Sequence, residues 1–508
     1  MNRKILSTGL ALMACFGVFA QSKTAIKFSQ GITKELANKH LSILASDEYE
    51  GRETGTKGAW MAADYIKNYF KSIGLRGPVG KKIGIPGDYF QSIDLVKYEL
   101  AQSILTVNGE TKEQFKDFVI LPSKVGIKGF TFNAPEIVFA GAGTDKQRQD
   151  FTGMNVDGKV VMVMTKYYDL KYLTDHNALA IIIVDPDLDN ASEEQIARYK
   201  EPARLVFKNE DNVARINKQK LLSSISISLA TAKSIFKAAG LSNTPVAGLL
   251  KVPISATAMK KETPVRAENV LGFLEGSDPK LKKEVLVITG HYDHIGISES
   301  GKDRINNGAD DDGSGTTGVL MIADAFSRAK KAGYGPKRSI LFMTVVGEEK
   351  GLWGSDWYSE HPVFPLENTI TNLNIDMIGR GDAAHATDNN FVYIIGSSML
   401  SSDLDRVSKK ANKDYVDIKL DETYNNRTDP NRFYYRSDHY NFAKHGIPVI
   451  FYFNGVHQDY HQPGDEVSKI DFPMLAKRTK LVYFTAWELA NGAKRPIVDK
   501  NDDGTPIK

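Results

Sequence analysis

Cysteine is almost absent from the chain, since Cys15 is the only one in 508 residues. It lies in an amino-terminal segment that has a basic start at residues 2–4, an apolar stretch and then a small residue, Ala20. This order predicts a secretory signal peptide over residues 1–20 that is cleaved before Gln21. The remaining chain would then contain no cysteine, which excludes disulfides, thiolate ligands and cysteine nucleophiles. Any metal ion must be held by His, Asp and Glu.

After residue 20 the chain has no apolar run long enough to cross a bilayer, so we expect no membrane-spanning helix and no stable membrane insertion. The signal peptide then predicts a periplasmic or secreted protein. An alternative is a lipoprotein attached through Cys15, because "LMAC" loosely matches the signal for that attachment. The run "FGVFA" that follows is unusually apolar for the start of a mature lipoprotein, which favours the cleaved signal peptide.

A large excess of charge is missing as well, because the formal net charge is only +3. No basic stripe is interleaved with aromatic residues, so we expect no nucleic-acid partner. The hydrophobic share of 42% and the charged share of 25% are ordinary for a soluble globular protein. A chain of this length exceeds the usual size of one hydrophobic core, which favours two domains.

The pattern of apolar runs divides the chain. Residues 21–114 and 253–495 are expected to form one α/β domain, with helices near 33–45 and 57–73 and alternating strands and helices from 269 onward. Its strands are nearly continuous apolar runs, typical of a mixed, mainly parallel sheet flanked by helices: "EVLVIT", "SILFMTVV", "TNLNIDMI", "FVYIIG" and "PVIFYFN". Residues 115–252 carry short β-branched runs and are expected to form an inserted, mostly β domain. The segment "KKETPVRAEN" is expected to link the two, and residues 496–508 to form a polar tail.

Polar side chains follow the predicted strands of the α/β domain. Because ligands bind beyond the carboxyl ends of parallel strands, these side chains are expected to converge. Acidic residues before a helix are more often caps, and adjacent glutamates usually face solvent, so the argument rests on the whole set. The set comprises His291, Asp293, His294, Asp310, Asp311, Asp312, Glu348, Glu349, Asp376, His457, Asp459 and His461.

Imidazoles and carboxylates without thiols suit zinc, and a hydrolytic pair of zinc ions needs one shared carboxylate and an open position for water. Two Zn²⁺ bring four positive charges, of which three carboxylates remove three. The remaining charge favours deprotonation of a bridging water near neutral pH. One further glutamate is then needed to move the proton.

Six segments, in order, resemble the co-catalytic di-zinc aminopeptidase family, which includes carboxypeptidase-like and dipeptidase members. They are "GHYDHIG", "NNGADDDGSG", "VVGEEKGLWGS", "LNIDMIG", "YRSDHYNFAKHGIPVIF" and "DYHQPGDE". The match covers nearly all of residues 269–492, and "SDEYEGRETGTKGAWMAADYIKNYF" is similar to the family's amino-terminal helices. The segment "EIVFAGAGTDKQRQDFTGMNVDGKVVMVM" resembles a protease-associated domain inserted in such peptidases.

This resemblance implies two Zn²⁺ per chain and a role for particular residues. Asp310 matches the bridging carboxylate, and the family's cis peptide bond would be Asp310–Asp311. Glu349 and His461 would complete one zinc site. His291 and Asp376 would complete the other.

The remaining matches concern catalysis and substrate. Glu348 matches the general base, and Asp293 matches the carboxylate that orients His291. His294 receives no role. Three further residues are expected to line the substrate pocket: Asp438, His439 and His457.

We therefore expect an exported zinc exopeptidase, and the aminopeptidase interpretation is favoured. Such an enzyme would use a metal-bridging hydroxide, with Glu348 as general base, to remove the amino-terminal residue of peptides. A carboxypeptidase- or dipeptidase-type relative stays open. A glutaminyl cyclase-like enzyme would use one zinc and depart from "GADDDGSG" and "GEEKG", which this chain keeps. A receptor-like ectodomain without activity is disfavoured because all six metal and base positions are filled. The sequence does not indicate an oligomeric state.

Overall fold

The computed structural model describes residues 23–80, 87–143, 148–218, 221–241, 246–501 and 503–507. The expected signal peptide, its cleavage point and Cys15 lie outside the described residues. The chain divides into two units, Met1–Ile93 with Arg266–Lys508, and Asp94–Val265. Each is described by itself.

The first unit is built on a mixed sheet of eight strands. In spatial order they are β1 (Phe90–Ser92), β13 (Glu268–Leu274), β15 (Ser339–Val345), β14 (Val285–His291), β16 (Thr369–Ile375), β19 (Val449–Phe453), β17 (Phe391–Ile395) and β18 (Lys419–Asp421). The central strands β15, β14, β16 and β19 run parallel, whereas β13 and β17 are antiparallel to their central neighbours. The predicted α/β fold class is confirmed.

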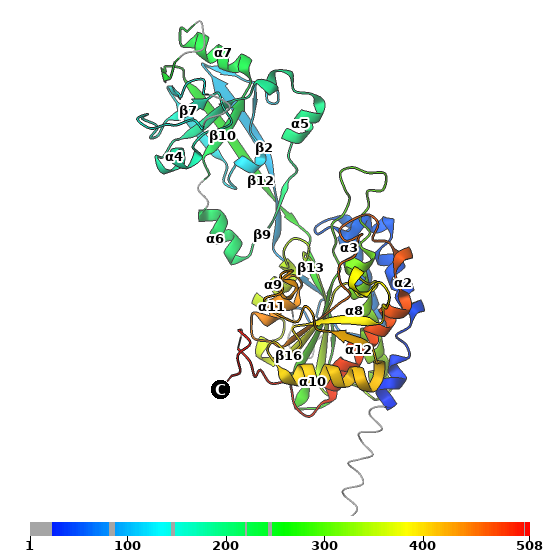
Figure 1. Ribbon diagram of the computed structural model, residues 1–508. Coiled ribbons are helices and arrows are strands. Elements are labelled where there is room, and N and C mark those ends of the chain that lie inside the picture. The colour runs from blue at the N-terminus through cyan, green and yellow to red at the C-terminus, as the bar shows by residue number, and fades with distance from the viewer. Residues whose placement is uncertain are drawn as a thin grey trace, which may run out of the picture. The chain divides into compact units, whose positions relative to one another are not determined.

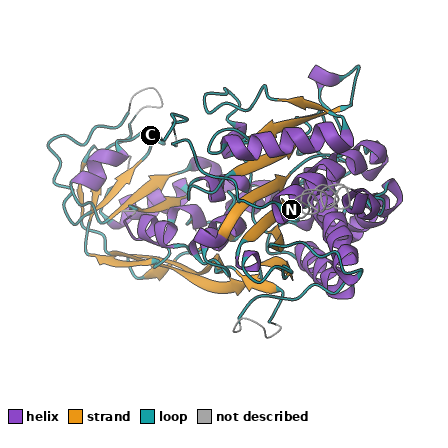
Figure 2. Ribbon diagram, turned by 90° about the horizontal axis from the view of Figure 1, so that it is seen from below, coloured by secondary structure: helices purple, strands orange, loops and turns teal. Residues whose placement is uncertain are grey.

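Helices cover both faces of this sheet (Figures 1 and 2). They are α2 (Lys34–Leu44), α3 (Lys57–Ser72), α8 (Gly315–Lys331), α9 (Trp353–Glu360), α10 (Ser402–Ala411), α11 (His439–Ala443) and α12 (Phe472–Asn491). Helices α2, α3, α8 and α12 pack against one another, and α9 packs on α11, which contacts β16 and β19. Every side chain of β14, β15 and β16 is buried, which explains their continuous apolar runs.

Capping side chains mark where these helices begin. Thr33 accepts a hydrogen bond from the backbone N–H of Leu36 at the start of α2, and Asp471 accepts one from Met474 at the start of α12. Among the described residues, no helix combines the length and apolar character that crossing a membrane requires. The predicted tail is anchored in part, since Asp499 N donates to Leu400 O.

The second unit contains two sheets. One has the order β11 (Gly248–Leu250), β6 (Ile137–Phe139), β7 (Val160–Val163), β8 (Ala180–Val184), β10 (Ser223–Ile227) and β4 (Phe118–Val119). The other has β3 (Glu110–Thr111), β2 (Leu95–Val107), β12 (Ile254–Val265) and β5 (Phe130–Ala134), with β9 (Arg204–Phe207) on β2. Its helices are α4 (Leu170–Asp175), α5 (Glu193–Tyr199), α6 (Glu210–Lys218) and α7 (Leu229–Ala238).

The second unit is longer at both ends than the predicted range 115–252. Strands β2 and β12 pair antiparallel over their whole length, from Leu95 opposite Val265 to Val107 opposite Ile254. The whole of "KKETPV" is therefore strand rather than linker. None of its six side chains is buried, so the sequence there lacks the alternation of apolar and polar residues that predicts a strand.

Candidate metal and catalytic site

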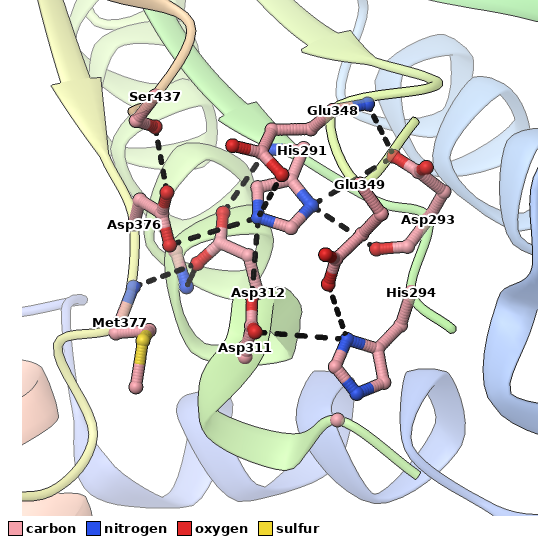
Figure 3. Close-up of polar contacts among 12 residues, drawn as sticks. His291, Asp293, His294, Asp311, Asp312, Glu348, Glu349, Asp376, Met377 and Ser437 are labelled. Atoms are coloured by element: carbon pink, nitrogen blue, oxygen red, sulfur yellow. Dashed lines mark hydrogen bonds and ion pairs between the residues drawn. The ribbon is translucent and has the colours of Figure 1, made fainter. Parts of the chain in front are cut away.

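The ends of three neighbouring parallel strands bring the candidate residues together, as the sequence predicts. His291 is the last residue of β14, Glu348 follows β15, and Asp376 follows β16. In Figure 3 these side chains point toward one another at this edge of the sheet. The loop between β14 and α8 adds further aspartates beside them.

One cluster surrounds the Nε2 atom of His291. This atom lies 3.3 Å from Asp311 Oδ1, 3.6 Å from Asp376 Oδ1 and 4.0 Å from Glu348 Oε2. The side chain of His291 is buried, and its Nδ1 atom lies 3.1 Å from the backbone oxygen of Asp293. That contact leaves Nε2 directed at the carboxylates.

A second cluster surrounds the Nε2 atom of His461. It lies 3.0 Å from Glu349 Oε2 and 3.2 Å from Asp311 Oδ2. The two oxygens of Asp311 therefore face one histidine each. Among the described residues, Nε2 of both histidines and Oδ2 of Asp311 are buried without a hydrogen-bond partner. Unpaired imidazole nitrogens that converge on carboxylate oxygens form the donor set that zinc prefers, so these residues fit two ions.

Asp310 does not occupy the bridging position that the resemblance assigns to it. Its Oδ1 accepts hydrogen bonds from Gly379 N at 2.6 Å and Ser314 Oγ at 2.9 Å, and its Oδ2 lies 3.3 Å from His457 Nε2. The cis peptide bond is Asp311–Asp312 rather than Asp310–Asp311. Both predictions were one residue early, and the geometry moves the bridging position to Asp311.

Asp312 ties the parts of the site together, a role that the sequence did not reveal. Its carboxylate accepts hydrogen bonds from the backbone N–H groups of His291, Gly315 and Met377. These groups belong to the end of β14, the start of α8 and the segment after β16. Burial raises the pKa of Asp312 well above its usual value.

His294 also contacts the site, although it received no role in the sequence analysis. Its Nδ1 atom lies 2.8 Å from Glu349 Oε1 and 3.8 Å from Asp311 Oδ2 (Figure 3). The ring packs so closely on Gly308, where φ is +55°, that a Cβ atom there would lie 2.6 Å from it. The spacing of His291 and His294 in "GHYDHIG" was the available signal.

Side chains of the segment before α3 donate hydrogen bonds to the loops that carry the site. Arg52 is fully buried and donates to the backbone oxygens of Leu44, Tyr292, Asn307 and Gly308. Thr54 Oγ1 donates to Asp293 Oδ2 at 2.6 Å.

Asp293 links this segment to both predicted roles. Its Oδ1 lies 3.7 Å from His291 Nδ1 and accepts a hydrogen bond from Glu348 N at 3.3 Å. Asp293 therefore connects the predicted ligand to the predicted base.

A cavity adjoins the two clusters and is walled largely by apolar side chains. Its lining comprises Asp311, Glu348, Asp376, Met377, Phe433, Arg436, Phe451, Phe453, Val456 and Tyr460. The predicted pocket residues Asp438, His439 and His457 are not among them.

These three side chains lie behind the cavity wall. Asp438 accepts a hydrogen bond from Ser355 Oγ at 2.5 Å, and His439 stacks on Phe451 with ring centres 4.7 Å apart. His457 Nδ1 lies 3.2 Å from Arg380 Nη1. Asp438 and His439 are buried because helix α11, which begins at His439, packs against β16 and β19. His457 lies after β19, where its Nε2 atom is 3.3 Å from Asp310 Oδ2.

The electrostatics of the site suit a base beside a cation. Burial raises the pKa of Glu348 well above its usual value; His291 opposes this and Glu349 and Asp376 add to it. Burial also disfavours a charged His461, but the carboxylates of Asp311 and Glu349 outweigh it and raise the pKa of His461 to about 10. A field that holds a proton on imidazole this firmly also attracts a metal cation.

Comparison with known proteins finds a match to one protein family. Residues 269–486 match the model of peptidase family M28. A probable zinc metalloprotease of Pyrenophora teres f. teres is 28% identical over an alignment of 280 residues. The match covers 48% of this chain and 56% of that protein. A probable leucine aminopeptidase of Arthroderma benhamiae is 28% identical over 246 residues, 44% of this chain and 64% of that protein. The chain thus spans little more than half the length of the first of these curated relatives.

Among solved structures, an aminopeptidase from Aneurinibacillus sp. strain AM-1 is similar with a TM-score of 0.49 and 17% identity, covering 95% of this chain and 100% of that one. The zinc aminopeptidase BSAP from Bacillus subtilis has a TM-score of 0.48 and 20% identity, covering 91% of this chain and 96% of that one.

Proposed function

We propose that the protein is a zinc-dependent aminopeptidase that uses two ions per chain, on the premise that residues 269–486 match the model of peptidase family M28. The observation that carries the proposal is the position of Asp311, whose two oxygens face His291 and His461 from opposite sides at 3.3 and 3.2 Å. A carboxylate so placed is suited to bridge a pair of ions.

Each ion would have its own set of ligands besides Asp311. His291 and Asp376 would hold one ion, and Glu349 and His461 the other. When bound, zinc supplies a Lewis acid for the peptide carbonyl and lowers the pKa of the water that attacks it. Asp293 and Thr54 hold His291 in its ligating orientation from behind.

Glu348 is proposed as the general base. Its carboxylate lines the cavity, and its nearest oxygen lies 4.0 Å from His291 Nε2, further than those of Asp311 and Asp376 at 3.3 and 3.6 Å. Burial raises the pKa of this carboxyl, which makes it a better proton acceptor. Glu348 would take the proton of the attacking water and deliver it to the leaving amine.

The choice of an aminopeptidase rests on the cavity. Its aromatic wall of Phe433, Phe451 and Phe453 suits an apolar first side chain. The curated leucine aminopeptidase that the chain resembles acts, by its name, on such residues.

Export is part of the proposal, and it is supported by the basic start, apolar stretch and Ala20 of the sequence. The likeness of the inserted unit to a protease-associated domain is likewise proposed from its sequence pattern and its β-rich fold.

Purified protein should be assayed with leucine p-nitroanilide, its N-acetylated form, free dipeptides and peptides blocked at the amino end. We expect turnover only where the amino end is free, loss of activity after chelation, and recovery with zinc. Cleavage of the blocked peptides from the carboxyl end would instead show a carboxypeptidase. Ring closure of amino-terminal glutamine by a protein that holds one zinc would show a cyclase.

A further inference from the structure

One positively charged side chain stands in the wall of the acidic cavity. Among the described residues that line it, Arg436 is the single cation. The side chain is exposed to solvent, whereas the three carboxylates of the lining lie at the inner end with the metal ligands. Those carboxylates are assigned to the two metal ions and the general base, and Arg436 has no function in that scheme.

The guanidinium group of Arg436 is positioned by aromatic side chains rather than by an acid. It lies over the ring of Phe433, 5.0 Å from the ring centre, and its Nη2 atom is 3.4 Å from Tyr460 OH. No ion pair joins it to a carboxylate in the part of the chain that the structure describes. Arg380, by contrast, pairs with Asp459 at 2.8 Å. The contact with Phe433 holds the exposed guanidinium group, whose charge is not paired with an acid among the described residues.

The backbone places Arg436 close to the proposed reaction centre. The next residue, Ser437, donates through its hydroxyl to Asp376 Oδ2 at 2.6 Å. Tyr460, which contacts the guanidinium group, directly precedes His461. One neighbour of the cation therefore contacts a side chain of the metal clusters, and the other directly precedes one in the chain. An extended peptide advances about 3.3–3.6 Å per residue, and Arg436 lines the same cavity as Asp311, Glu348 and Asp376, so we place the residue after the cleaved bond beside it.

We propose that Arg436 binds a carboxylate on the leaving side of the substrate and makes the enzyme selective for substrates that carry one there. The inference rests on the proposed aminopeptidase function. The carboxylate has two possible sources, the free carboxyl end of a dipeptide or an acidic second side chain. A planar guanidinium fork binds either in the same bidentate manner.

The test compares Arg436→Met with Arg432→Met. Arg432 is a matched control because it also stacks on an aromatic ring, 5.1 Å from the centre of Tyr435, but is not part of the cavity lining. Two pairs of substrates distinguish the two sources of the carboxylate. Leu-Ala against Leu-Ala amide tests the free carboxyl end, and Leu-Asp amide against Leu-Asn amide tests an acidic second side chain. Thermal melting of each variant checks that it folds as the parent does.

The wild type should prefer the charged member of at least one pair by about tenfold or more in kcat/KM, mainly through KM, because hydrogen bonds to charged groups are worth that much. Arg436→Met should bring that ratio close to one, while Arg432→Met keeps it. Preference within the first pair identifies the chain end, and preference within the second identifies the side chain. Equal turnover within both pairs, or a ratio that survives in Arg436→Met, overturns the inference while the aminopeptidase function stands. No turnover of any of the four overturns both.

Discussion

The hydrogen bond between Thr54 and Asp293 can be tested by removing one oxygen atom from Thr54. Its hydroxyl donates to Asp293 Oδ2 at 2.6 Å, and both side chains are buried. Valine has nearly the same shape as threonine, so Thr54→Val deletes the hydrogen bond and little else. A hydrogen bond to a charged group contributes about 1.5–3 kcal/mol, and the loss leaves a buried carboxylate oxygen short of a donor. We expect the free energy of unfolding to fall by about that amount.

The same change should weaken zinc binding, because Asp293 orients His291 from behind. Losing such a partner typically costs about 10–100-fold in metal affinity or activity. Urea unfolding of the metal-free protein and competition with a fluorescent zinc chelator measure the two effects separately.

Thr56→Val is the matched control, since the Thr56 hydroxyl donates to Glu53 O at 2.7 Å in the same segment without contacting the site. It should bind zinc as the parent does. The reasoning is refuted if Thr54→Val is destabilised yet binds zinc with unchanged affinity, or if both variants lose affinity equally.

Four further outcomes are expected. Glu348→Gln should keep its zinc but lose about 10²–10⁴-fold in kcat with little change in KM, as metal analysis beside kinetics would show. Glu349→Ala should lose zinc together with activity, so a Glu349 variant with full zinc content would contradict its assignment. The protein exported by its native host should begin at or near Gln21 in amino-terminal sequencing, and a retained Met1 or a lipidated Cys15 would contradict export by cleavage. Burial lowers the pKa of His40 to about 4, so the unfolded state binds more protons and stability is lost as the pH falls from about 6.5 to 4. His40→Gln should reduce that loss by up to about 3 kcal/mol, measured by urea unfolding at both ends of the window.

The sequence predicted the sheet and the convergence of the site because both depend on local patterns. Strands β14 and β16 are buried on both faces, so their apolar runs are continuous and their carboxyl ends are easy to place. The positions of His291, which ends β14, and of Asp376, which directly follows β16, can therefore be predicted from the sequence. Asp310 and Asp311 could not be told apart in this way, because three aspartates in succession are chemically equal and only the backbone of the loop decides which side chain faces the histidines.

Other features depend on contacts between distant parts of the chain. Arg52 reaches Tyr292 and Gly308, more than 200 residues further on, from a charged run that resembles an exposed turn. No periodicity predicts such a contact. The start of the second unit at Asp94 likewise depends on the pairing of β2 with β12, which are separated by most of that unit.

Zinc content of two neighbouring variants tests the central claim most directly. Asp311→Asn and Asp310→Asn make the same chemical change at adjacent buried positions. Asparagine at 310 can still accept the hydrogen bonds from Gly379 and Ser314, whereas at 311 it removes the charge between the two histidines. Metal analysis of the purified proteins should find two zinc ions per chain in the wild type and in Asp310→Asn, and fewer in Asp311→Asn. One ion in the wild type, or loss of zinc from Asp310→Asn while Asp311→Asn keeps both ions, would contradict the account.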